Sequence, residues 1–141
     1  DEPNYFIHEN NIESREVGSG MIGTRKIKFK ALLEDLKNKF NCESIKYTDI
    51  IKPEINKIAV CGGSGSFLTH EAIGKGADVL ISSDFKYHDF FEANNQITLI
   101  DIGHYESEQF TKDLIFEFLS KNLINIALHL SNENTNPIKY Y

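Results

Sequence analysis

The residues of this sequence best suited to metal chemistry are His104 and Glu108, four positions apart. They follow the apolar run Thr98–Ile102, which predicts a buried β-strand that stops at Gly103. In an open α/β sheet the ligand crevice lies at the carboxyl ends of the strands, where His104 is expected. An imidazole and a carboxylate suit a borderline divalent ion. The alternative is that His104 is a plain loop residue and that Glu108 serves the helix dipole.

A second group of reactive side chains comprises Asp84, Lys86, His88 and Asp89. It follows the apolar stretch Asp78–Ser82, which predicts another strand. Four titratable residues within six positions are dense for a loop, although charged loop residues are usually just solvated. We take Asp84, Lys86 and His88 as candidates for proton transfer or for orienting metal ligands.

The elements that position these groups form a βαβ unit. Lys57–Cys61 is expected to be a buried strand, Gly62–Ser66 a tight turn capped by Ser66, and Phe67–Lys75 a helix that precedes strand Asp78–Ser82. Such a unit predicts parallel strands with a right-handed crossover. The Gly62–Ser66 turn, the Asp84 loop and His104 should therefore converge on one rim of the sheet.

Two glycine-rich stretches raise the alternative of nucleotide binding. Gly18, Gly20 and Gly23 spell GxGxxG but lack the preceding buried strand and the following helix, so a strand or bulge is the better interpretation. Gly62–Ser66 meets a helix N-terminus that could hold an anion, yet it lacks the Gly-Lys-Ser/Thr ending of a phosphate loop. A sharp turn explains those glycines equally well.

Bulk properties narrow the function classes. The 141 residues predict one domain, and the net charge of −6 argues against nucleic acid or an anionic membrane as the main partner. No apolar run is long enough for a membrane span. Cys42 and Cys61 lack CxxC spacing, which favours reduced thiols and a cytoplasmic protein.

The remaining pattern completes a mixed α/β fold. Lys30–Phe40 predicts a helix and Ser44–Thr48 a short strand. A helix is expected over Glu108–Lys121, with a stripe at core spacing that comprises Phe110, Leu114, Ile115, Phe118 and Leu119. Alternation predicts a strand over Ile124–Leu130, and Ile138–Tyr141 is a candidate edge strand.

Six blocks occur in an order that resembles a known family. They are Val17–Gly23, Ala59–Gly65, Gly76–Val79, Asp84–Asp89, Asp101–Glu108 and Asn134–Pro137. Together they are similar to the C-terminal half of the Nif-three-like (NGG1-interacting-factor-like) dinuclear-metal family, whose members are often called GTP cyclohydrolase I type-two homologues. The resemblance covers nearly the whole chain, and no single block carries it.

The resemblance implies a two-lobed α/β fold assembled as a homo-hexamer, with two divalent ions (Zn, Fe, Mn or similar) held between the lobes. His104 and Glu108 match the ligands of the C-terminal lobe, while a His pair and an Asp come from the other lobe. This chain contains no His-His pair, and it opens at Asp1 without Met. We therefore expect a C-terminal fragment, with residues 1–16 as the tail of an upstream or inserted segment and 17–141 as the lobe.

The implied function is that of a metal-dependent hydrolase acting on a small molecule or nucleotide once the other lobe is present. The alternative is a non-enzymatic metal-binding scaffold or regulatory interaction module. A third hypothesis is a nucleotide-binding domain that uses Gly62–Ser66. Two ligands rarely hold an ion against water, so we expect weak or no metal binding by this chain alone.

Overall fold

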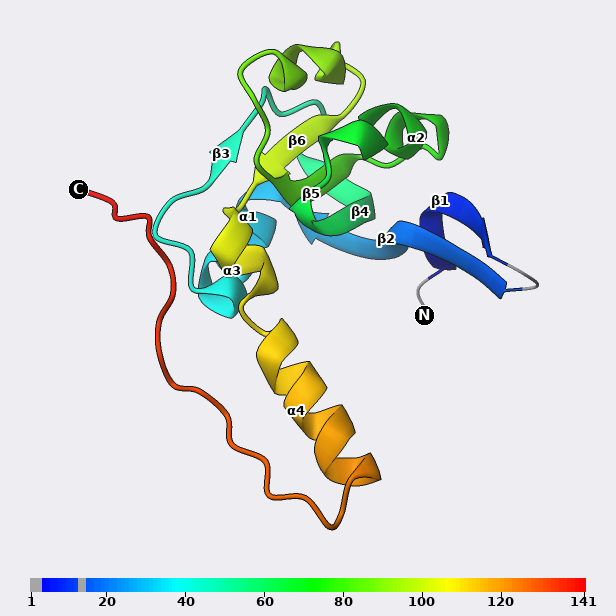
Figure 1. Ribbon diagram of the computed structural model, residues 1–141. Coiled ribbons are helices and arrows are strands. Elements are labelled where there is room, and N and C mark those ends of the chain that lie inside the picture. Colours follow the sequence, from blue (N-terminus) through cyan, green and yellow to red (C-terminus); the bar gives the residue numbers. More distant parts are fainter. Residues whose placement is uncertain (1–3, 13–14) are drawn as a thin grey trace.

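The computed structural model (Figure 1) describes residues 4–12 and 15–141 and contains a six-stranded mixed sheet in the order β1-β2-β4-β5-β6-β3. β1 (Asn4–Ile12), β2 (Arg15–Lys28) and β4 (Glu54–Ser64) pair antiparallel. β4, β5 (Val79–Ser83) and β6 (Thr98–Asp101) pair parallel, and the two-residue β3 (Lys46–Tyr47) pairs antiparallel with β6. The expected mixed, partly parallel α/β sheet is confirmed.

The centre of the sheet is covered on both faces. Leu80 and Leu99 belong to a core with α2 (Thr69–Gly74) and the 3-10 segment η2 (Asp89–Ala93). Their neighbours Val79, Ile81 and Ile100 belong to a second core with α1 (Phe29–Phe40). Alternate residues of a strand point to opposite faces, so two central strands buried on both sides read as continuous apolar runs. This is why β5 and β6 were predictable.

Asp78 ties the start of β5 to the start of β4. Its buried carboxylate accepts hydrogen bonds from Lys52 Nζ at 2.5 Å and from the backbone amides of Asn56 and Lys57 at 2.7 and 2.9 Å. Burial acts to raise the pKa of Asp78, but these hydrogen bonds outweigh it and leave the pKa below its ordinary value. The carboxylate is therefore held ionised at the end of the sheet opposite to His104.

The glycine-containing stretch from Gly18 to Gly23 lies within β2, as the strand interpretation predicted. The register of β2 against β4 shifts between Thr24 and Ile27, which is the signature of a bulge. Nothing in this stretch has the strand-turn-helix order of a dinucleotide site. Asp1–Pro3 and residues 13–14, which belong to the segment expected to be an upstream tail, lie outside the described residues.

The predicted helix Glu108–Lys121 is wrong in its bounds. The chain turns helical at once in α3 (His104–Glu108), breaks at Gln109 and Phe110, and continues as α4 (Thr111–Asn122). Glu108 thus ends a short helix instead of starting a long one. The positive φ of Gly103 (91°) permits the abrupt change from β6 into α3. The cap of the earlier turn differs too: Gly65, not Ser66, precedes the 3-10 segment η1 (Ser66–Leu68), without a side-chain capping bond.

The apolar stripe of α4 does not lie in the core. α4 has no buried residue, and Leu114, Ile115 and Phe118 are all more than half exposed. Figure 1 shows α4 extending away from the sheet, with the C-terminal tail running back beside it. The spacing correctly predicted one apolar helix face, but nothing in the described part of the chain covers it.

The strands expected over Ile124–Leu130 and Ile138–Tyr141 are absent. The described chain after Asn122 has neither helix nor strand, and Ile124 and Ile126 are exposed. Alternating apolar residues form a strand only where a neighbouring strand supplies hydrogen bonds and an apolar layer covers one face. Neither condition is met beside this tail.

Candidate metal-binding site

Three segments that follow successive parallel strands meet at one rim of the sheet. The end of β4 supplies Gly63 and Ser64, and the residue after β5 is Asp84. α3 begins with His104, three residues after β6 ends at Asp101. Hydrogen bonds join all three segments, as described below. The convergence predicted from the βαβ pattern is therefore confirmed for Asp84 and His104.

His104 lies between two carboxylates. Its Nδ1 is 2.6 Å from Asp84 Oδ2, and its Nε2 is 3.1 Å from Glu108 Oε2. The Asp84 carboxylate also accepts a hydrogen bond from the Ser64 hydroxyl at 2.7 Å. The side chains of Asp84, His104 and Glu108 are about half exposed, and Ser64 is exposed, so the cluster opens to solvent at the rim.

The two carboxylates set the electrostatics of the cluster. Hydrogen bonds from Ser64 and then from His104 lower the pKa of Asp84 below its ordinary value. The hydrogen bond to Asp84 raises the pKa of His104, and the charge of Glu108 adds to that effect. A site that favours positive charge on an imidazole also attracts a cation.

Gly63 allows Glu108 to reach His104. Its φ of +64° suits glycine, and a Cβ at this position would collide with Glu108 Oε1 and lie 3.5 Å from His104 Cε1. The Gly63 amide donates to Ser107 Oγ at 2.9 Å, and its carbonyl accepts from Ser82 Oγ at 2.9 Å. Because that amide is engaged, the turn offers one donor fewer to a phosphate.

Sequence reasoning missed Gly63, Ser64 and Ser107 as parts of this site. Gly63 and Ser64 lie in the glycine turn, which was interpreted as a sharp turn or an anion site and not as part of a metal site. Ser107 Oγ donates to the His104 carbonyl at 2.9 Å, so it joins α3 to the β4 turn through its contact with Gly63. The signal available in the sequence was that all three lie within two of the blocks that resemble the family, Ala59–Gly65 and Asp101–Glu108.

Lys86 and His88 are not brought into the cluster by any described hydrogen bond or ion pair. The Lys86 backbone amide instead donates a hydrogen bond to Asp89 Oδ2 at 2.9 Å, which forms a local turn. The His88 ring packs edge-on against Tyr87. Asp84 alone of the three candidates contacts His104. A role for Lys86 or His88 stays a prediction.

The donor set fits part of a divalent-metal site. An imidazole nitrogen and a carboxylate oxygen 3.1 Å apart can bond one ion at the usual ~2.0–2.2 Å. Asp84 would then hold the other ring nitrogen, as carboxylates commonly do for metal-bound histidines. Within the described ranges, however, no three His, Cys, Asp or Glu residues gather closely enough to hold a metal.

Comparison with known proteins places the chain in a family. A sequence model of the Duf34/NIF3 (NGG1p interacting factor 3) family matches residues 5–137. The chain belongs to this family. The expected resemblance is thereby confirmed.

This chain matches only part of each of the longer Duf34/NIF3 relatives. A GTP cyclohydrolase 1 type 2 homolog of Campylobacter jejuni is 39% identical over 115 residues, which cover 80% of this chain and 45% of that protein. A crystal structure of a Staphylococcus aureus protein superposes with a TM-score of 0.73 at 30% identity, covering 88% of this chain and 42% of that one. A Bacillus cereus protein related to NIF3 superposes with a TM-score of 0.75 at 23% identity, covering 90% and 37%, and shares the fold. The chain thus spans less than half of these relatives.

Two further features concern the cysteines and the length of the apolar helices. Both cysteines are free thiols, Cys42 buried and Cys61 half-buried, as the spacing predicted. Burial and then the charge of Glu106 raise the pKa of Cys42 to about 11, which disfavours the reactive thiolate form. No helix in the described part of the chain is long and apolar enough to cross a membrane.

Proposed function

We propose that this chain supplies His104 and Glu108 as ligands of a divalent-metal site in a metal-dependent hydrolase. The observation that carries the proposal is the ordered contact from Asp84 through His104 to Glu108. If Nδ1–H donates to Asp84, Nε2 carries the lone pair that could bond an ion beside the Glu108 carboxylate. This is the ring orientation that a metal-binding imidazole needs.

Family membership supports the reaction class. The relatives carry the name GTP cyclohydrolase 1 type 2 homolog, which points to hydrolysis of a nucleotide or another small molecule. Divalent ions of the Zn, Fe or Mn kind, two of them in the expected site, would supply an activated water and stabilise negative charge on the substrate. The remaining ligands are expected from a second lobe, because His104 and Glu108 alone leave most of a coordination sphere unfilled.

The test compares two glutamates of the complete gene product that contains this chain. Glu108→Gln keeps the shape of the side chain but removes the charged donor. Glu117→Gln is the matched control, since Glu117 is an exposed α4 residue paired with Lys121. After dialysis, metal content per protomer should fall in E108Q and stay at the parent level in E117Q. Hydrolysis of GTP and of a generic phosphoester by metal-loaded protein should fall in parallel.

Equal metal content in E108Q and E117Q would overturn the assignment of Glu108 as a ligand. Normal metal content without hydrolysis of any nucleotide or phosphoester would instead favour the second candidate, a metal-binding scaffold or interaction module. The uncovered apolar face of α4 favours that candidate, because exposed apolar patches commonly mark contacts with other chains or lobes. We expect the complete gene product to be a homo-oligomer, a hexamer by family resemblance, which light scattering would test.

A further inference from the structure

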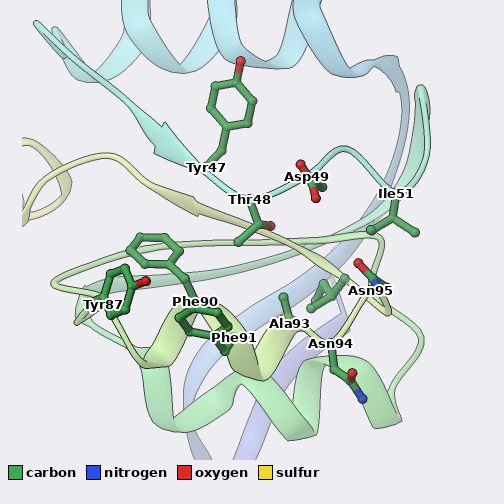
Figure 2. A pocket seen from close by; sticks show the side chains of 11 residues that line it. Tyr47, Thr48, Asp49, Ile51, Tyr87, Phe90, Phe91, Ala93, Asn94 and Asn95 are labelled. Carbon is green, nitrogen blue, oxygen red and sulfur yellow. The ribbon is translucent and has the colours of Figure 1, made fainter.

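A groove lies on a different part of the molecule from the candidate metal site. It has a volume of about 500 Å³ and lies between the segment that follows β3 and the η2 segment (Figure 2). None of its lining residues is His104, Glu108 or Asp84. Its volume falls within the ~300–1,000 Å³ range of small-molecule sites.

Aromatic side chains from η2 and the preceding loop form one wall. In Figure 2 Tyr87, Phe90 and Phe91 gather on the same side of the groove. The rings of Tyr87 and Phe91 meet edge to face with centroids 5.2 Å apart, although the side chains are 73% and 66% exposed. Phe90 fixes this wall to the core, because its ring packs at a tilt against the ring of the core residue Phe85, with the ring centroids 5.4 Å apart. The exposed rings of Tyr87 and Phe91 therefore lie next to Phe90, which the core holds in place.

Polar side chains occupy other parts of the groove. Asp49 comes from the segment after β3, while Asn94 and Asn95 follow η2. Both asparagines have positive φ (41° and 55°), and the Gln96 amide closes the turn by donating to the Ala93 carbonyl at 2.7 Å. This is the geometry of a type I′ turn, which favours asparagine. No described hydrogen bond or ion pair uses the side chains of these three residues.

The segment that carries Asp49 is fixed to the sheet by its backbone. The Asp49 carbonyl accepts from Thr98 Oγ1 at 3.0 Å, and the Ile51 amide donates to the same hydroxyl at 3.2 Å. Thr98 is fully buried at the start of β6. The carboxylate of Asp49 is therefore presented from an anchored backbone, and its charge is not neutralised by a described cation.

We propose that this groove binds the base of a nucleoside. A flat heterocycle suits an aromatic wall, because bases stack on exposed rings. A carboxylate only accepts hydrogen bonds when ionised, so the ligand edge must donate. Guanine is the base that offers two adjacent donors, N1–H and the N2 amino group, and an asparagine amide can donate to its O6. The proposal does not rest on the metal site, and it differs from nucleotide binding by the Gly62–Ser66 turn.

The test titrates guanosine and inosine into the complete gene product in the presence of a chelator, with heat as the readout. Inosine lacks the N2 amino group and serves as the matched ligand. We expect guanosine to bind more tightly than inosine. Asp49→Asn should reduce this preference, because an amide replaces one of the two acceptors with a donor. The chelator separates this outcome from the proposed metal chemistry.

Two phenylalanines test the aromatic wall. Phe91→Ala should weaken guanosine binding about 5- to 150-fold, the range expected for loss of one stacking partner. Phe67→Ala is the control, because Phe67 is 60% exposed on η1 and does not line the groove. If F91A fails to fold, Tyr87→Ala provides the same test from the neighbouring ring.

Three outcomes would overturn the proposal. The first is no binding of either nucleoside at the limit of its solubility. The second is guanosine binding that F91A and Y87A leave unchanged. The third is a change of oligomeric state in F91A, without nucleoside binding by the parent protein, which would identify the wall as a protein contact.

Discussion

The contact between Gly63 and Glu108 gives the sharpest test of how the β4 turn shapes the site. Replacing Gly63 with Ala has two effects. The positive φ of +64° becomes unfavourable by ~1–2 kcal/mol, as for any L-residue with a Cβ. The new Cβ would also collide with the Glu108 carboxylate, whose carbon would be only 3.2 Å away, so the carboxylate must leave its place beside His104 Nε2.

Gly76 separates these two effects. It also has a positive φ (+72°), but a Cβ added there meets nothing within 4 Å. Gly76→Ala therefore carries the backbone cost without the collision. G76A should lose a few degrees in thermal unfolding and G63A at least as much, since ~1 kcal/mol corresponds to roughly 2–8 °C for domains of this size range.

Metal affinity should distinguish the two alanine variants. Disturbing groups that orient metal ligands typically weakens binding ~10- to 100-fold, and displacement of Glu108 should cost at least as much in G63A. G76A should bind like the parent. The assay is a competition titration of the complete gene product against a chelator of known affinity. Equal affinities for G63A and G76A would show that Glu108 is not held in place by the glycine and would refute the reasoning.

Two further substitutions test the packing that supports the site. Asp78→Asn should lower the free energy of unfolding at neutral pH by ~1.5–3 kcal/mol, the usual worth of hydrogen bonds to a charged group. Because the folded-state pKa of Asp78 is lowered, its contribution is present above the ordinary pKa near 4 and is lost as the pH falls through the lowered value. Urea unfolding at neutral and acid pH should therefore show a smaller pH effect in D78N, and equal pH dependence would count against this role. Ser107→Ala should cost ~1–3 kcal/mol because the buried Gly63 amide loses its acceptor, and denaturant midpoints equal to the parent would contradict it.

The parallel strands at the centre of the sheet were predictable because their burial is visible in the local sequence pattern. Val79–Ser83 and Thr98–Asp101 are buried on both faces, and a continuous apolar run records that burial directly. Glycines indicated the turns. Because β4, β5 and β6 run parallel, their carboxyl ends must lie at the same edge of the sheet. Asp84 and His104 could therefore be placed on one rim before their contact was seen.

Other features depend on contacts that no local pattern records. The stripe of α4 signals an apolar face but not what covers it, and the alternation of Ile124–Leu130 signals a strand only if a partner strand exists. The approach of Gly63 to Glu108 joins residues 45 positions apart, so only the folded chain reveals it. Lys86 and His88 share a loop with Asp84, but their distances from His104 depend on how η2 turns that loop.

The separation of α4 from the core has a consequence for the cooperativity of this chain. Segments with few buried apolar contacts open at small free energies, while core strands open only with the whole domain. In the chain as it stands, the amides of α4 and of the tail should exchange with solvent deuterium independently of those in β5 and β6. The rim that carries Asp84 and His104 is rooted in the slowly exchanging strands. Local melting of α4 would therefore leave this pair of residues in place.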